Sequence, residues 1–308
     1  LSEVIYSQPH LGEEEHEVLD LIGGLWRRLH ASLGSQSQKW SGLLARTLRA
    51  RAIQGSNSIE GYLVTNEDAL AAVDGDSPED AEEESWQAVI GYRTAMSYVL
   101  RLGTAAEFGY DANLLRSLHY MMTQHSTRAN PGTWRPGPIF VRSSETGEIV
   151  YEGPPRDLVP ALVDQLCEGL TAADRDAAIL RASLAHLNLV MIHPFSDGDG
   201  RMSRCLQTLV LARGGVLDPT FCSIEEYLGR NTAAYYAALA QVGQGSWHPE
   251  RDTLRWVRFC LSAHYIQAAT ARRRLDHTAL IGEQVESMLQ KAGRPERAAV
   301  ALTNAVLG

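Results

Sequence analysis

The sequence predicts an all-α protein, a helical bundle that carries a single β-hairpin. Apolar residues recur three or four positions apart along most of the chain, which is the period of an amphipathic helix. Only the segment near residues 134–155 departs from this period. There, two β-prone runs at 139–141 and 149–151 flank a turn containing Gly147. With 308 residues and 44% hydrophobic content, the chain is long enough to bury a large core.

The helices are expected in a definite order along the chain. Ser77-Pro78 is expected to start one of them, as a cap followed by proline at the first helical position. The next is expected to begin near Asp111. The expected helical segments are 13–33, 38–53, 77–100, 111–122, 158–170, 176–191, 201–213, 223–228, 231–240 and a long C-terminal helix from about 256, with further helical material over 277–308.

The composition excludes several classes of protein. A net charge of −9 argues against broad nucleic-acid binding, and the seven acids between residues 74 and 84 predict a solvated loop and helix start. No apolar run approaches the ~18 residues that a membrane span needs, and no signal peptide is expected at the start. The four cysteines form no CxxC pair, so we expect buried thiols in a reducing cytoplasm.

Residues 192–204, which read IHPFSDGDGRMSR, are the stretch richest in chemistry. They lie between two helical patterns, and Gly198 and Gly200 allow a tight loop whose following helix turns its N–H groups toward an anion. Arg201 and Arg204 are spaced i, i+3, so both can face that anion. Two further side chains, Asp197 and His193, offer a magnesium ligand and a base near neutral pH. Each of these residues taken by itself could have a purely structural role, such as a helix cap or a turn. Their joint spacing predicts a phosphate site.

The pattern His193-Pro-Phe195-x-Asp197-Gly198-x-Gly200-Arg201-x-x-Arg204 resembles the signature of the Fic-domain family, H-x-F-x-[DE]-G-N-G-R-x-x-R. The resemblance covers roughly residues 40–270. It implies a Fic-type helical bundle in which the hairpin near 134–155 is a flap that holds a target segment by strand addition. The alternative for the hairpin is an ordinary surface feature.

The resemblance also implies the activity of a protein adenylyltransferase, which transfers AMP from Mg-ATP to a hydroxyl of a target protein. His193 would be the general base, and Asp197 would bind Mg²⁺. The main chain of residues 198–201 would hold the β-phosphate, and Arg204 would reach the γ-phosphate. The target is not identified by the sequence, and a homodimer is an expectation from the resemblance alone.

Asp199 departs from the family signature, which has Asn at this position. An Asn can donate to phosphate oxygens, whereas an ionised Asp cannot and repels them. Asp199 is therefore a second metal ligand, a handicap to nucleotide binding, or the sign of a different transferred group. The alternatives for function are a different nucleotidyl or phosphate donor, removal of AMP, or a non-enzymatic regulator that binds partners.

A second motif precedes the first. Ser56-x-x-x-Glu60-Gly61 resembles the inhibitory motif [ST]-x-x-x-E-[GN] of many Fic proteins, and its position implies the N-terminally inhibited class. Glu60 would then pair with Arg204 in place of the γ-phosphate. Gly61 would serve equally well as a helix end.

A tyrosine pair completes the predicted site. Tyr235-Tyr236 matches a pair found at this point in several Fic proteins, so Tyr236 is a candidate for stacking on adenine, with packing in the core as the alternative. We divide the chain into an N-terminal helical region (1–105), a Fic catalytic core (106–270) and a C-terminal helical extension (271–308).

Overall fold

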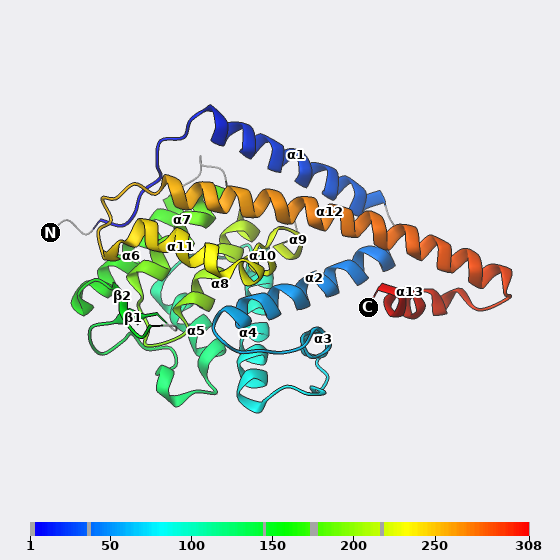
Figure 1. Ribbon diagram of the computed structural model, residues 1–308, viewed down its shortest axis with the longest axis horizontal. Coiled ribbons are helices and arrows are strands. Elements are labelled where there is room, and N and C mark those ends of the chain that lie inside the picture. The colour runs from blue at the N-terminus through cyan, green and yellow to red at the C-terminus, as the bar shows by residue number, and fades with distance from the viewer. Residues whose placement is uncertain (1–3, 36–37, 144–145, 173–177, 216–218, 308) are drawn as a thin grey trace.

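The computed structural model describes residues 4–35, 38–143, 146–172, 178–215 and 219–307. It is a helical assembly with one small sheet, as Figure 1 shows, and this confirms the predicted fold class. At its centre, helix α7 (Ala178–Ile192) packs against helix α8 (Asp199–Arg213), and a short loop joins the two. Almost every residue of α8 is buried, its charged residues near the N-terminus included. The predicted phosphate motif therefore lies inside the molecule.

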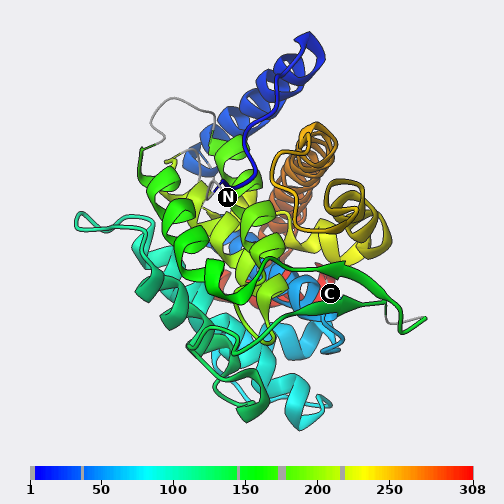
Figure 2. The same ribbon diagram turned by 90° about the vertical axis from the view of Figure 1, so that its left-hand side faces the viewer.

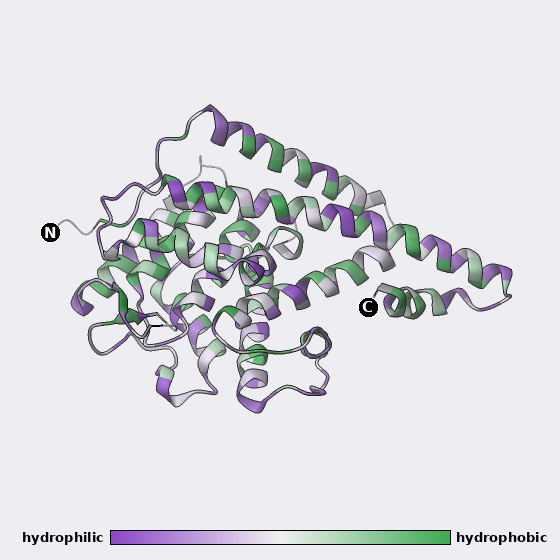
Figure 3. Cartoon of the chain, viewed as in Figure 1, coloured by the Kyte–Doolittle hydropathy of each residue, from purple (hydrophilic) through white to green (hydrophobic). Residues whose placement is uncertain are grey.

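The other helices surround this pair. Helix α1 (Glu13–Ser35) lies along α12 (Leu254–Lys291), and α2 (Gln38–Ile59) packs on α10 (Glu225–Arg230). The remaining helices are α3 (Asn66–Asp74), α4 (Glu83–Leu102), α5 (Ala112–Thr123), α6 (Val159–Ala172), α9 (Pro219–Cys222), α11 (Thr232–Gly243) and α13 (Ala299–Leu307), with 3₁₀ turns η1 (Thr127–Ala129), η2 (Arg156–Leu158) and η3 (Glu296–Ala298). Hydrophobic residues lie mainly on the inward faces, as Figure 3 shows.

One large buried cluster reaches from Leu11 to Leu275, so its side chains come from both sides of residues 105–106. Helix α12 continues without a break across residues 270–271. A smaller cluster at the far end packs Trp40 of α2 against Leu289 of α12 and Ala299 of α13. The large cluster thus spans the first predicted boundary and helix α12 spans the second, and the division of the chain stays a prediction.

The predicted hairpin is present. Strands β1 (Phe140–Arg142) and β2 (Ile149–Glu152) are antiparallel, with Val141 opposite Tyr151, and the hairpin projects from the helical body in Figure 2. Residues 144–145 of the expected turn lie outside the described residues. A third strand, β3 (Gly245–Ser246), pairs with β2 in parallel and was not predicted. Two residues are too few to show an alternating pattern in the sequence.

The helix start predicted at residues 77–78 is wrong, because α4 begins at Glu83. The buried Asp68 carboxylate accepts hydrogen bonds from the main-chain N–H groups of Glu79 (2.8 Å) and Asp80 (3.4 Å). These bonds hold the main chain of Glu79 and Asp80 as a loop against α3. The sequence did not predict helix α3. The seven acids of the run are exposed, as predicted, although Asp74 also bonds to Arg46 of α2.

In the described part of the chain, no helix has both the length and the apolar character needed to cross a membrane. The four cysteines are buried and free, as predicted.

Candidate active site

His193 follows the last residue of α7, and its own hydrogen bonds help to complete that helix. Its N–H donates to Leu189 O (3.0 Å), and its ring Nδ1 lies 3.1 Å from Val190 O. Because a carbonyl can only accept, Nδ1 carries the hydrogen and Nε2 carries the lone pair of the neutral ring. Burial lowers the pKa of His193, which favours that neutral form. The neutral ring therefore has the tautomer that a general base requires, with its lone pair on Nε2.

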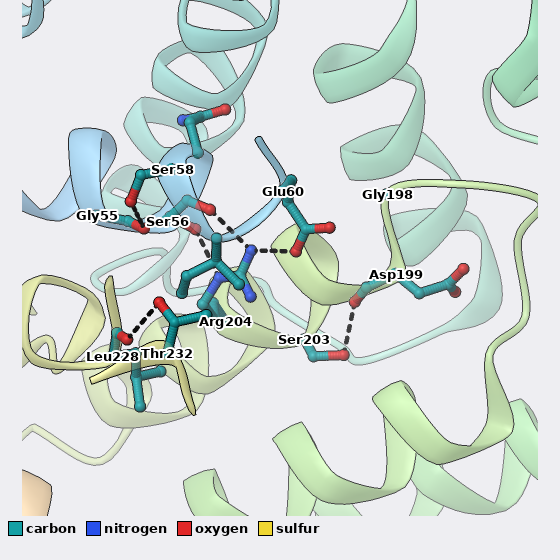
Figure 4. Close-up of polar contacts among 12 residues, drawn as sticks. Gly55, Ser56, Ser58, Glu60, Gly198, Asp199, Ser203, Arg204, Leu228 and Thr232 are labelled. Atoms are coloured by element: carbon teal, nitrogen blue, oxygen red, sulfur yellow. Dashed lines mark hydrogen bonds and ion pairs between the residues drawn. The ribbon is translucent and has the colours of Figure 1, made fainter. Parts of the chain in front are cut away.

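Asp199 does not face the phosphate site. Its Oδ1 accepts from Phe195 N (3.1 Å), and its Oδ2 lies 3.3 Å from His193 Nε2. Figure 4 shows its side chain turned away from Arg204 and Glu60. This orientation argues against repulsion between Asp199 and phosphates, one of the three alternatives that the sequence left open. The physical reason is local, since the side chain folds back from the first residue of α8 to satisfy a buried N–H of the loop.

The contact between Asp199 and His193 is close enough for an ion pair, but the protonation of the two groups argues against one. Burial raises the pKa of Asp199 well above its usual range, although the bond from Phe195 opposes this. Burial lowers the pKa of His193. Both shifts favour neutral forms, so we interpret the contact as one between a carboxylic acid and an imidazole.

The N-terminus of α8 already holds a carboxylate, that of Glu60. Gly198 precedes the helix with φ +81°, and Gly200 lies in its first turn. A Cβ at Gly200 would lie only 2.2 Å from Glu60 Oε1, so the absence of a side chain makes room for this group. A helix N-terminus attracts anions, because its N–H groups and dipole point outward. The Glu60 carboxylate thus lies against the first turn of α8, where the sequence predicts an anion cradle.

Arg204 is the centre of the predicted inhibitory contact. It is 1% exposed, its Nε donates to Ser56 Oγ (2.7 Å), and its Nη2 donates to Ser56 O (2.9 Å) and Glu60 Oε1 (2.6 Å). Figure 4 shows the guanidinium between these two residues. Burial disfavours the charge, but Glu60 and nearby tyrosines outweigh it and raise the pKa of Arg204. The spacing of Ser56 and Glu60 thus brings both to one arginine.

Glu60 directly follows α2, whose last residue is Ile59, six residues beyond the predicted end. Gly61 ends the helix with φ +86° and donates to Ser58 O (3.1 Å), so it is also the helix end that its sequence indicated. A Cβ at Gly55 would lie 2.6 Å from Glu225 O, so this part of α2 packs directly on the main chain of α10. This close packing fixes the position of the turn that carries Glu60.

The site fits a bound phosphate. Arg201 is 1% exposed, and its guanidinium carbon lies 4.8 Å from the centre of the Tyr62 ring. In the described part of the chain, Arg201 Nε and Nη1 and Arg204 Nη1 are buried without a hydrogen-bond partner. Buried donors without acceptors are costly, and phosphate oxygens would satisfy them.

The Asp197 carboxylate could serve as the single protein ligand of a magnesium ion whose other ligands are substrate phosphates and water. Its carboxylate is exposed, and its Oδ1 accepts from Gly198 N (2.7 Å). The described residues contain no group of three or more His, Cys, Asp or Glu side chains able to hold a metal. Mg²⁺ is commonly bound by one or two carboxylates together with substrate phosphates and water, so a single carboxylate is compatible with it.

The two tyrosines of the pair have different environments. Tyr235 is 1% exposed and its hydroxyl lies 2.9 Å from His186 Nε2, whereas Tyr236 is 49% exposed. The Tyr236 hydroxyl donates to Ile59 O (3.2 Å), beside the turn that carries Glu60. Packing in the core therefore applies to Tyr235, and Tyr236 is the ring that remains accessible to a ligand.

Two residues at the site were not predicted, His119 and Arg135. The His119 Nδ1 accepts from Gly132 N (2.9 Å), its Nε2 lies 2.9 Å from Asp197 O, and its ring stacks on Phe195 at 3.7 Å. Burial lowers the pKa of His119 to about 4, so it is a neutral support for the loop. Its only sequence signal was a polar residue within an apolar helical pattern. Arg135 lies within a cluster of turn residues, and its contacts are described below.

Comparison with known proteins agrees with this geometry. Residues 109–211 match the model of the Fic/DOC family, a range that includes the hairpin and the whole phosphate motif. The chain is a Fic-domain protein. A solved structure of a Fic family protein from Desulfovibrio desulfuricans G20 superposes with a TM-score of 0.73 at 23% identity, covering 98% of this chain and 91% of that one. This likeness shows the shared fold.

Two protein adenylyltransferases are similar in sequence to this chain at modest identity. Protein adenylyltransferase fic-1 of Caenorhabditis elegans is 39% identical over 71 residues, which are 23% of this chain and 13% of that protein. Protein adenylyltransferase Fic of Nematostella vectensis is 27% identical over 223 residues, which are 68% of this chain and 46% of that protein. The chain thus spans less than half the length of these relatives.

Proposed function

We propose that this Fic-domain protein transfers AMP from Mg-ATP to a hydroxyl side chain of a target protein, and that Glu60 inhibits the transfer. The observation that carries the proposal is the joint geometry of His193 and α8. A neutral imidazole with its lone pair on Nε2 lies beside a helix N-terminus with two buried arginines. The names of the similar relatives, protein adenylyltransferases, support the same reaction.

His193 would act on the target hydroxyl. Its Nε2 takes the proton as the hydroxyl oxygen attacks the α-phosphorus of ATP, and the bond to the bridging oxygen of the β-phosphate breaks. AMP is then joined to the target, pyrophosphate leaves, and the proton is on His193. The bond between Nδ1 and Val190 O keeps the ring in the tautomer that can accept this proton.

The other residues would position and stabilise the nucleotide. The unpartnered donors of Arg201 and Arg204 and the N-terminus of α8 would bind the β- and γ-phosphates. Asp197 would hold Mg²⁺, which neutralises phosphate charge when bound. Tyr236 would stack on adenine, and the flap would hold an extended segment of the target.

Glu60 inhibits in this proposal because it occupies the γ-phosphate position. Its Oε1 bonds to Arg204 Nη2 at 2.6 Å and lies over Gly200. ATP that binds with Arg204 already engaged must place its phosphates differently, which turns the α-phosphate away from in-line attack. A cytoplasmic location and a homodimer are further proposals that rest on the sequence reading alone.

The test is labelling with nucleotides. Wild type and Glu60→Gly are incubated with Mg²⁺ and α-labelled ATP, GTP, UTP or CTP, and protein-bound label is measured, with Glu60→Gly/His193→Ala as the control. We expect label from ATP, more in Glu60→Gly and none in the control. Labelling by another nucleotide would overturn the choice of donor. Absence of label from all four, or label that persists without His193, would overturn the transfer itself.

A further inference from the structure

Arg135 lies between the catalytic loop and the base of the flap, and it is 1% exposed. Its Nε donates to His193 O (2.9 Å), its Nη1 to Gly137 O (2.5 Å) and its Nη2 to Pro154 O (2.6 Å). Its main-chain N–H donates to Pro194 O (2.9 Å). Gly137 precedes β1 and Pro154 follows β2, so one guanidinium joins both ends of the hairpin to the carbonyl of His193.

The main chain of His193 needs support of this kind, because its φ of +50° lies in the left-handed region. A residue other than glycine keeps such a conformation only where surrounding contacts hold it. Its N–H and ring Nδ1 bond to the end of α7, to Leu189 O and Val190 O. Among the described contacts of His193, the bond from Arg135 is the one that holds its carbonyl. Without that bond, the His193 carbonyl loses this partner, and the left-handed conformation that places Nε2 loses one of its restraints.

A second bond from the flap reaches the same end of α7. Tyr151 of β2 is 8% exposed, and its hydroxyl donates to Met191 O (2.8 Å). The last carbonyls of a helix lack donors within the helix, and here the flap supplies one of these donors, the Tyr151 hydroxyl. The hydrogen bonds of the Arg135 side chain all go to main-chain carbonyls, and burial lowers the pKa of Arg135. An apolar side chain at this position would leave the three carbonyls without this donor, which is costly for buried groups.

We propose that Arg135 is a positioning residue that holds His193 Nε2 in register with a target segment on the flap. This inference rests on the proposed function. The flap presents the hydroxyl and the loop presents the base, and a single planar guanidinium sets the distance between them. A displacement of about 1 Å in such geometry lowers a rate on the order of 10²-fold. The arginines that we assign to the phosphates lie on α8, to which the Arg135 side chain donates none of these bonds, so we expect them to keep their places when Arg135 changes.

The experiment uses Arg135→Lys in the Glu60→Gly protein, since lysine keeps the charge but cannot reach three carbonyls in three directions. The control is Arg213→Lys at the opposite end of α8, where an exposed arginine donates to the carbonyls of Leu102, Gly103 and Ala105 through Nη1 alone, an arrangement that needs no planar fork. Three quantities are measured: the rate of self-modification with labelled Mg-ATP, the Kd for Mg-ATP by calorimetry, and the ¹⁵N shifts of the His193 ring. The His193 signals are assigned by comparison with His193→Gln.

We expect Arg135→Lys to lower the transfer rate about 30- to 100-fold with the Kd within about threefold, and to change the His193 ring shifts. Arg213→Lys should change none of these. A rate loss no larger than in the control, or unchanged His193 shifts, would overturn the inference. So would equal losses of rate and Mg-ATP affinity, which would show a merely structural role. If the Glu60→Gly protein transfers no nucleotide, the proposed function fails, and the ring shifts still decide the role of Arg135.

Discussion

Replacement of Glu60 by glycine should activate the protein, because Glu60 holds the arginine that we assign to the γ-phosphate. The Arg204 side chain is fully buried and that of Glu60 is 24% exposed, so water screens their 2.6 Å contact only in part. A hydrogen bond between charged groups of this kind contributes roughly 1.5–3 kcal/mol. At 1.4 kcal/mol for each factor of ten, the loss of Glu60 should raise transfer about 10- to 100-fold.

The measurement is the initial rate of protein labelling with α-labelled Mg-ATP, together with the Kd for Mg-ATP. Glu60→Gln keeps the shape of the side chain but not its charge, so we expect an intermediate gain. Glu67→Gln removes an exposed carboxylate seven residues away and should change neither quantity. The reasoning is refuted if Glu60→Gly gains no activity while Mg-ATP still binds. It is refuted equally if Glu67→Gln is activated to the same extent.

Three further predictions concern the flap, the loop and a buried acid. Val141→Pro removes an N–H from the outer strand of the flap and should reduce target modification, while the Mg-ATP affinity measured by calorimetry stays within a few-fold. Equal losses of target modification and Mg-ATP affinity would contradict a docking role for the flap. Asp199→Asn should also leave that affinity within a few-fold, because the carboxyl faces His193; tighter binding by tenfold would show that it faces the phosphates after all. Burial raises the pKa of Glu225 to about 7, so the folded protein keeps a proton that the unfolded chain loses above its ordinary pKa. Stability should therefore fall as pH rises from about 4.5 to 7, by up to roughly 3 kcal/mol, and Glu225→Gln should abolish this fall in thermal unfolding at pH 5 and pH 8; an unchanged pH profile would refute it.

The sequence by itself determined the helical class, the hairpin and the residues of the phosphate motif. Each of these signals is local, since a helical period, a glycine-rich turn and an i, i+3 arginine pair depend on neighbours a few residues apart. The contact between Glu60 and Arg204 spans 144 residues, and it was predicted only because a short motif of Ser56 and Glu60 resembled one known from the family. Where such a motif was absent, distant contacts were missed.

The tertiary structure alone decided the direction of Asp199 and the roles of His119 and Arg135. Asp199 was expected at the phosphates because the Asn that the family has at this position can donate to phosphate oxygens, yet the Asp199 carboxyl accepts from the buried N–H of Phe195. Arg135 meets His193 across 58 positions of the chain, and no period or spacing encodes that meeting. Buried polar groups must find partners wherever the packed chain brings them, and that is set by the whole fold rather than by any segment of it.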